Sequence, residues 1–275
     1  MRTVLFTKLF GSRGLDEIGP TVADLGFDGV DLLIRPGFSV TPDEADLLPR
    51  AVSDLRALGL DVPMATTDLT DPANFPTAKV FGACAEAGVG LIRLGYWNYN
   101  GSRPYDGIRD QARRDLDELE RLAASYGVGL AIQLHGGTIH SSGALTRVLL
   151  EGRDPAAVSA YPDPGNQVVQ DGREDWRLTF DLLRPWLSCV GVKNGGWFAG
   201  TTQESGGRAW QSDWLGLADG MVPWPDILDH LRTTGFDGLL SFHSHYELPY
   251  EQVLDQTRVD LRFVRRCLDR AAESS

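Results

Sequence analysis

Gly-Phe-Asp-Gly stands at residues 26–29 and again at residues 235–238, each time between a predicted helix and a predicted strand. A glycine just past a helix is typical of a helix end, and a short apolar run after it is typical of a buried strand. The recurrence favours equivalent helix-to-strand turns at distant points of one pseudo-symmetric ring. The alternative is a chance recurrence of a common turn sequence.

The same alternation of strand and helix runs outward from these turns through the chain. The strands are predicted at 3–7, 30–35, 61–67, 90–95, 129–135, 157–161, 188–193 and 238–245. The helices are predicted near 15–25, 42–58, 74–87, 105–126, 142–151, 174–185, 223–234 and 249–271. Such alternation implies parallel pairing through right-handed crossovers. For 275 residues it predicts one α/β domain over 1–275, a (β/α)8 TIM barrel.

Composition narrows the classes of function. No Gly-x-Gly-x-x-Gly follows the first strand, which disfavours an open nucleotide-binding sheet and a nucleotide cofactor. The net charge of −12 disfavours nucleic acid as a partner. No apolar run approaches the roughly 18–20 residues of a membrane span. The start of the chain looks like a strand rather than a signal peptide, and three distant cysteines suit a reducing compartment, so we expect a cytoplasmic protein. Homo-oligomerisation stays open.

Residues 195–222, rich in Gly, Ser and Trp, are predicted to form a long loop without regular structure. A loop of that length inside a compact domain is usually functional or mobile.

Polar side chains gather where the predicted strands end. In Leu239-Leu-Ser-Phe-His-Ser-His-Tyr-Glu247, His243 and His245 lie two residues apart and therefore on one face of the strand. The same alternation turns further side chains toward the barrel axis: Thr7, Asp31, Arg35, Thr67, Arg93, Gln133, His135 and Lys193. Since the carboxyl ends of barrel strands form the active-site mouth, we expect a small-molecule site there.

Structural explanations compete for several of these residues. Arg35 and Arg93 could be solvated rim charges. Lys193 could cap the barrel by pairing with Asp163, which follows the sixth strand. An inward histidine is often a hydrogen-bonded core group, although four of the five histidines fall at or just after two strand ends.

Six segments carry a resemblance to a known superfamily. They are residues 26–32 with 35–37, Ile132-Gln-Leu-His-Gly-Gly137, Asp163-Pro-Gly-Asn166, Val192-Lys-Asn194, residues 217–224 and residues 240–246. In their order along about 270 residues, the chain resembles the xylose isomerase-like TIM-barrel superfamily of sugar and sugar-phosphate isomerases and epimerases. The resemblance implies a divalent ion bound by Glu, Asp, His and Glu, and proton transfer next to a carbonyl.

The chain departs from that pattern at the metal ligands. Asp163 alone matches, while the expected glutamate of the fifth strand falls on Gln133. The expected histidine of the seventh strand falls near Gly191. The expected glutamate of the eighth strand falls on His243, or on His245 if the register shifts by two. Such a set would suit Zn, Mn, Ni or Co better than a hard ion such as Mg²⁺.

The first hypothesis is therefore a sugar isomerase- or epimerase-like enzyme with an altered metal site at the barrel mouth. Gln133, Asp163 and His243 would bind the metal, with His135 as a further donor. His243 or His245 would carry the proton. Lys193 would polarise the substrate. The residues expected to hold a sugar-like substrate are Arg35, Arg93, His135 and Trp197.

Two alternatives remain open. One is a metal-free lyase or isomerase in which Lys193 acts as base or electrophile and the histidines shuttle protons. The other is a non-catalytic sugar-binding barrel whose aromatic side chains stack on sugar faces, the candidates being Tyr96, Trp97, Trp197, Trp210 and Trp214. Asp31 or Glu247 could supply the missing carboxylate, or pair with Arg35 or Arg93.

Overall fold

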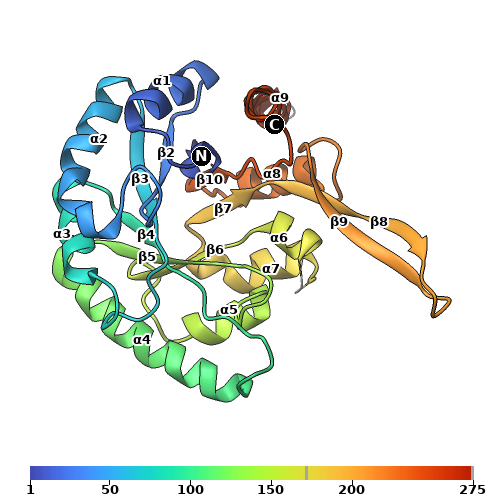
Figure 1. Cartoon of the computed structure of the whole chain (residues 1–275), viewed down its shortest axis with the longest axis horizontal. Coiled ribbons are helices and arrows are strands. Elements are labelled where there is room, and N and C mark those ends of the chain that lie inside the picture. Colours follow the sequence, from blue (N-terminus) through green and yellow to red (C-terminus); the bar gives the residue numbers. More distant parts are fainter. Residues whose placement is uncertain (171–172, 274–275) are drawn as a thin grey trace.

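Eight parallel strands surround the centre of the molecule in the computed structural model, which describes residues 1–170 and 173–273 (Figure 1). They are hydrogen-bonded in the order β6-β5-β4-β3-β2-β1-β10-β7. Their bounds are β1 Arg2–Phe6, β2 Gly29–Leu33, β3 Asp61–Thr66, β4 Leu91–Arg93, β5 Gly129–Gln133, β6 Val158–Tyr161, β7 Cys189–Val192 and β10 Leu239–Phe242. The predicted (β/α)8 TIM barrel is confirmed.

The ring closes at a seam between β6 and β7, which are less extensively paired than the other neighbouring strands. One isolated bridge joins Ala160 to Leu187. The Ser188 amide donates to the Ala160 carbonyl at 3.2 Å, and the Gly191 amide donates to the Pro162 carbonyl at 2.8 Å. These few bonds bring the end of β7 beside the turn that follows β6.

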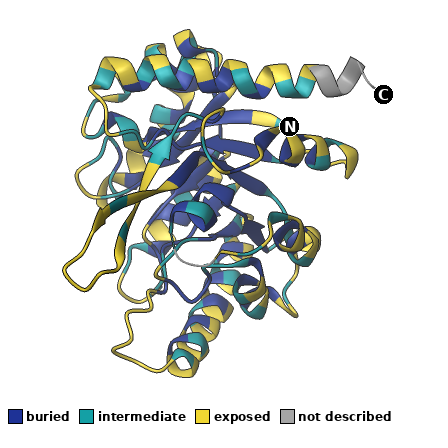
Figure 2. Ribbon diagram, turned by 90° about the vertical axis from the view of Figure 1, so that its right-hand side faces the viewer, coloured by how far each residue is buried: buried dark blue, intermediate teal, exposed yellow. Residues whose placement is uncertain are grey.

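Helices cover the outside of the ring, and their faces alternate between buried and exposed in Figure 2. Their bounds are α1 Leu15–Leu25, α2 Leu48–Ala57, α3 Thr77–Ala87, α4 Tyr105–Tyr126, α5 Gly143–Leu150, α6 Pro164–Val169, α7 Trp176–Leu183, α8 Trp224–Thr233 and α9 Tyr250–Glu273. Short 3-10 helices occupy Thr7–Phe10 (η1), Pro42–Leu47 (η2) and Arg184–Trp186 (η3). Within the described ranges, no helix has both the length and the apolar character that crossing a bilayer requires.

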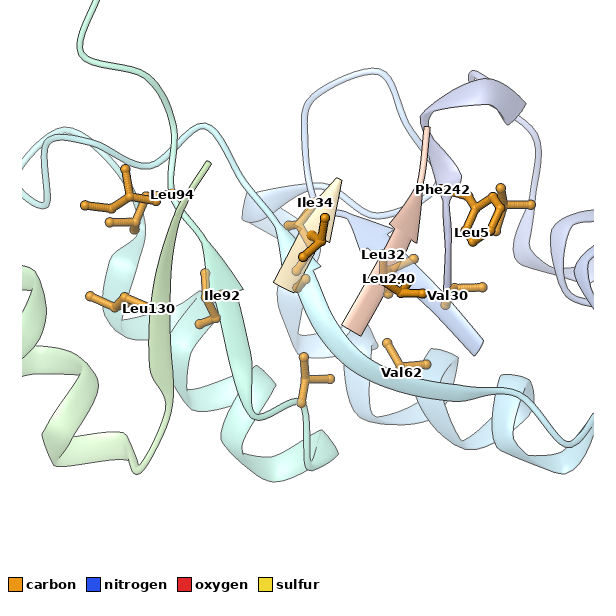
Figure 3. Close-up of a cluster of buried hydrophobic side chains, with 14 of the residues drawn as sticks. Leu5, Val30, Leu32, Ile34, Val62, Ile92, Leu94, Leu130, Leu240 and Phe242 are labelled. Atoms are coloured by element: carbon orange, nitrogen blue, oxygen red, sulfur yellow. The ribbon is translucent and has the colours of Figure 1, made fainter. Parts of the chain in front are cut away.

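The core has two layers. Outward-facing strand residues such as Leu32, Leu240 and Phe242 pack between the sheet and the helices (Figure 3). A smaller inner set fills the barrel: Val4, Met64, Ala131, Tyr161, Cys189 and Leu239. Burying each large apolar side chain stabilises the fold by about 1.5–3 kcal/mol, so the outer layer holds the helices on the ring.

The two Gly-Phe-Asp-Gly turns are structurally equivalent. Gly26 and Gly235 have positive φ values of 91° and 74°, which glycine adopts without steric cost. A Cβ at Gly29 would lie 2.2 Å from the Asp61 carbonyl oxygen, and one at Gly238 would lie 2.2 Å from that of Ser188. In each turn the first glycine ends the helix. The second glycine, because it has no Cβ, allows the backbone of the new strand to approach the adjacent strand closely.

A bulge in β3 changes which side chains reach the barrel interior. Gly29 lies opposite Asp61, but Asp31 lies opposite Met64, so β3 contains one extra residue. The prediction that Thr67 faces inward is therefore wrong, and Thr66 takes that place. The Thr67 hydroxyl instead donates to the Arg93 carbonyl at 3.0 Å.

The prediction for Thr7 is also wrong. The strand β1 ends at Phe6, and η1 begins at Thr7. The Thr7 hydroxyl accepts a hydrogen bond from the Leu33 amide at 2.9 Å instead of facing the mouth. Phe6 and Lys8 point there in its place.

The predicted loop at 195–222 is largely a β-hairpin, so that prediction is wrong too. Strands β8 (Asn194–Thr202) and β9 (Arg208–Leu215) pair antiparallel as a separate two-stranded sheet. The hairpin projects from the barrel in Figure 1, and most of its length is exposed in Figure 2. Its base continues from β7 and so adjoins the barrel mouth.

Candidate functional site

A pocket of about 190 Å³ lies at the carboxyl ends of the strands. The predicted site residues that line it are Arg35, Arg93, Gln133, His135, Lys193, His243 and His245. Five further side chains complete the lining: Phe6, Lys8, Tyr96, Gln170 and Trp214. A wider surface hollow of about 450 Å³ lies by α6, α7 and the start of α8, apart from the converging polar side chains.

An ion pair between Asp163 and Lys193 forms the buried floor of the site. Lys193 Nζ lies 3.0 Å from Asp163 Oδ2, and the two side chains are 4% and 0% exposed. Gln133 Nε2 donates to the same oxygen at 2.7 Å. The other oxygen, Oδ1, caps α6 by accepting from the Asn166 amide at 2.9 Å. Both carboxylate oxygens are thus engaged inside the protein.

Two glycines make this ion pair sterically feasible. A Cβ at Gly191 would lie 2.5 Å from Asp163 Oδ2. A Cβ at Gly165 would lie 2.5 Å from the Cγ atom of Lys193. The absence of a side chain at 191, where the resemblance implies a histidine, therefore leaves room for the Asp163 carboxylate.

The electrostatics of Lys193 reflect competing effects. Burial lowers the pKa of Lys193 from its usual value, and the Asp163 carboxylate opposes that shift. The ammonium also lies 4.9 Å from the centre of the Trp214 ring, which reaches the pocket from β9. A lysine held in this way presents a fixed donor at the floor of the pocket.

The pocket histidines come from two parts of the ring. His243 Nε2 lies 2.7 Å from the Tyr161 hydroxyl, and its ring packs against Phe6 at 4.6 Å. The His245 ring lies 5.5 Å from that of His243, and its Nε2 has no hydrogen-bond partner within the described residues. His135 Nδ1 lies 2.8 Å from the Gly136 carbonyl, on the β5 side.

All three imidazoles are held neutral. Burial lowers the pKa of His135, His243 and His245, in the last case to about 2. For His243 and His245 the positive charge of Lys193 lowers the pKa further. Neutral imidazole offers one donor and one acceptor nitrogen.

Two arginines also line the pocket, Arg35 after β2 and Arg93 at the end of β4. Arg35 forms an ion pair with Asp68, while its Nε is buried with no partner among the described residues. Arg93 is buried, and it donates to Gln133 Oε1 at 3.1 Å and to the Thr67 carbonyl at 3.0 Å. Its guanidinium also stacks over the Tyr96 ring at 4.3 Å. Both arginines are held in place at the pocket wall.

The carboxylates considered as substitutes lie elsewhere. Asp31 is buried inside the barrel, where it accepts hydrogen bonds from Thr66 at 2.7 Å and Ser241 at 2.8 Å. Burial raises its pKa to about 6. Glu247 is exposed. Neither lines the pocket.

The structure does not bring Trp197 into the pocket. Trp197 is 36% exposed, and its indole N–H donates to the Val168 carbonyl at 2.6 Å. Trp210 is exposed on the hairpin, and Trp97 is buried against Asp115. Of the aromatic candidates, only Tyr96 and Trp214 line the pocket. Phe6, Lys8 and Gln170 were missed, although the inward alternation of β1 could have identified Phe6.

The donor set does not fit a divalent ion. In the described part of the chain, no group of three or more His, Cys, Asp or Glu side chains could hold a metal. Asp163 is neutralised by Lys193, and His243 Nε2 is occupied by Tyr161. Divalent ions need several oxygen or nitrogen donors with free lone pairs, so we derive no chemical step through a metal.

Comparison with known proteins identifies the family of the chain. Curated proteins gave no match. Among solved structures, L-ribulose 3-epimerase is similar with a TM-score of 0.75 at 14% identity, covering 99% of this chain and 96% of that one. The 3-keto-D-glucoside 4-epimerase from E. coli has a TM-score of 0.70 at 16% identity, covering 97% and 100%.

A third structure, a xylose isomerase-like TIM barrel protein from Mycobacterium smegmatis in complex with magnesium, has a TM-score of 0.72 at 16% identity, covering 97% of both chains. At these identities the similarity concerns the fold. The family model for xylose isomerase-like TIM barrels matches residues 20–267, most of the chain. With its eight-stranded ring and polar mouth, the chain therefore belongs to the xylose isomerase-like TIM barrel family.

Proposed function

We propose that the chain is a sugar isomerase or epimerase that moves a proton on a carbon next to a carbonyl group without a divalent metal. Membership of the family and the structural similarity to L-ribulose 3-epimerase and 3-keto-D-glucoside 4-epimerase support this class of reaction. The pocket at the strand ends supports a small-molecule substrate.

The buried Lys193–Asp163 ion pair is the observation that carries the metal-free form of this proposal. Removing a proton beside a carbonyl leaves the electron pair on an enediolate, with negative charge on the former carbonyl oxygen. A fixed donor in a water-poor pocket stabilises such charge as it develops. Lys193 lines the pocket and supplies that donor.

The neutral histidines would carry the proton. His135 follows β5 and His245 follows β10, and β5 and β10 are not neighbours in the ring. Histidines on separate walls can approach a substrate from different sides. In the proposed step the carbon gives its proton to the acceptor nitrogen of one neutral imidazole, the enediolate forms against Lys193, and the imidazolium so formed returns that proton to carbon.

Solvent exchange at carbon tests the proposal directly. The protein is treated with EDTA, incubated in deuterium oxide with a panel of ketoses and aldoses, and followed by NMR for deuterium beside the carbonyl. We expect exchange to survive chelation. In the double variant Asp163→Asn, Lys193→Met, which removes both charges of the buried pair together, exchange should fall by about 100-fold or more. Lys79→Met, at an exposed ion pair with Asp46, is the matched control.

Three outcomes contradict the proposal. Loss of exchange on chelation, with recovery on adding Zn²⁺ or Mn²⁺, would restore the metal-dependent hypothesis. Full exchange in the folded double variant would remove Lys193 from the reaction. Sugar binding without exchange over days would indicate a binding protein.

A further inference from the structure

We propose that the pocket selects a substrate bearing a carboxylate, such as a sugar acid, and holds that group with Arg35, Arg93 and Lys8. The inference rests on the proposed function, because it names the substrate class of the same site.

The pocket is cationic although the chain as a whole is acidic. Lys8, Arg35, Arg93 and Lys193 line it, and no Asp or Glu of the described residues does. Two of the three lysines of the chain are among them, while the net charge of the whole chain is −12. A cleft lined by one sign of charge concentrates ligands of the opposite sign.

Internal pairing accounts for only part of this positive charge. Asp163 pairs with Lys193 below the pocket, and Asp68 pairs with Arg35 beside it. Arg93 is 3% exposed, it donates to the neutral oxygens of Gln133 and Thr67, and it stacks on the Tyr96 ring. Its charge also acts on the Asp31 carboxyl inside the barrel, where burial raises the pKa and Arg93 lowers it, but no hydrogen bond joins the two among the described residues. A buried guanidinium without a hydrogen-bonded carboxylate is costly unless a ligand supplies one.

The buried Nε atom of Arg35 adds a second observation. It lacks a partner among the described residues, whereas an Nη atom of the same guanidinium is held by Asp68. A guanidinium fixed at one edge offers planar donors at another, which suits a carboxylate. Arg35 and Arg93 therefore bring two guanidinium groups to one pocket, each fixed by hydrogen bonds at part of its edge.

The surrounding backbone favours a carboxylate over a phosphate. Barrel phosphate sites commonly use the loops after the last two strands and a helix N-terminus, where backbone amides hold the oxygens. Here the exposed hairpin β8–β9 follows β7, directly after Lys193. The anion would be held by side chains, and a planar guanidinium matches a planar carboxylate.

An anion in the pocket would also assist the histidines. The charges of Lys193 and Lys8 contribute to lowering the pKa of His243 and His245. A bound carboxylate would offset those charges and bring the imidazoles closer to the working range of a general base.

Matched ligands that differ in one charge test the inference by calorimetry, without turnover. The probes are D-glucuronate, its neutral isostere D-glucuronamide, and D-glucose 6-phosphate, at low and high salt. We expect glucuronate to bind about tenfold or more tighter than glucuronamide, and the difference to shrink with salt. Arg35→Gln should remove most of that difference. Arg50→Gln, exposed on α2, should leave it unchanged.

Asp68→Asn provides a test in the opposite direction. Since it frees Arg35 of its internal partner, glucuronate should bind several-fold tighter, which loss of structure would not produce. Equal binding of glucuronate and glucuronamide would overturn the inference, and tighter binding of the phosphate would overturn the choice of carboxylate. Either result leaves the proton-exchange assay untouched, so the two proposals fail separately.

Discussion

Asp31 is a titratable side chain buried inside the barrel. Its carboxyl accepts hydrogen bonds from the hydroxyls of Thr66 and Ser241, yet burial still raises its pKa from 3.8 to about 6. The folded state therefore binds this proton more tightly than the unfolded state. The resulting stability is fully present below pH 3.8 and is lost as the pH rises through about 6.

Asp31→Asn should remove this pH dependence. A shift from 3.8 to about 6 corresponds to roughly 3 kcal/mol in the free energy of unfolding. From about pH 4 to about pH 7 the wild type should lose up to that amount relative to Asp31→Asn, as measured by urea unfolding. Asp54→Asn, at an exposed position, should follow the wild-type profile. Parallel profiles for wild type and Asp31→Asn would contradict the prediction.

Strand alternation predicted the direction of most pocket side chains. Gln133, Lys193 and His243 lie where a period of two places them. The prediction failed at Thr67 because the bulge in β3 adds one residue, and such a bulge has no clear signal in Asp-Val-Pro-Met-Ala-Thr. From the sequence, an ion pair with Asp163 is only one of the alternative roles of Lys193, because pairing depends on distances that a sequence does not contain.

At the scale of elements, β7 and α6 pack closely because residue 191 of β7 is a glycine. Gly191 leaves the space that Asp163 occupies at the start of α6. Gly191→Ala should force the buried carboxylate to move, which costs about 1–3 kcal/mol as overpacking does. Chemical denaturation measures the loss, and the exchange assay should show reduced activity. Gly107→Ala, at an open position in α4, should be neutral or stabilising. Equal stability of the two variants would contradict this account.

The hairpin β8–β9 could not be predicted from periodicity. A half-buried strand alternates apolar and polar residues, but most of this hairpin is exposed on both faces. Its glycines and serines therefore indicated a loop. Of the described hairpin residues, Trp214 near the end of β9 lines the pocket.

At the scale of the whole molecule, the eight strand-helix repeats and the ring were predicted because each repeat buries one apolar face. The sequence did not predict that the extent of pairing between neighbouring strands differs around the ring. The seam between β6 and β7 has one isolated bridge, whereas β7 and β10 are paired along four residues.

Local opening should therefore begin at that seam. The amides of Ser188 and Gly191 bond across it, while those of Leu239 and His243 bond from β10 to β7. We expect the first pair to exchange with deuterium faster than the second in NMR measurements under native conditions. Equal protection of the two pairs would show that the ring opens as a single unit.

The buried ion pair also limits which single substitutions the chain can accept around Asp163 and Lys193. Gly191→His would drive an imidazole into Asp163, and losing Lys193 alone would leave a buried carboxylate uncompensated at about 3–5 kcal/mol. Gln133→Glu would place a second carboxylate beside Asp163, with the guanidinium of Arg93, which donates to Gln133 Oε1, as its nearest counter-charge. The buried pair therefore opposes Gly191→His as a single change, so we expect descendants of this chain to acquire the metal-binding set only if several positions change together.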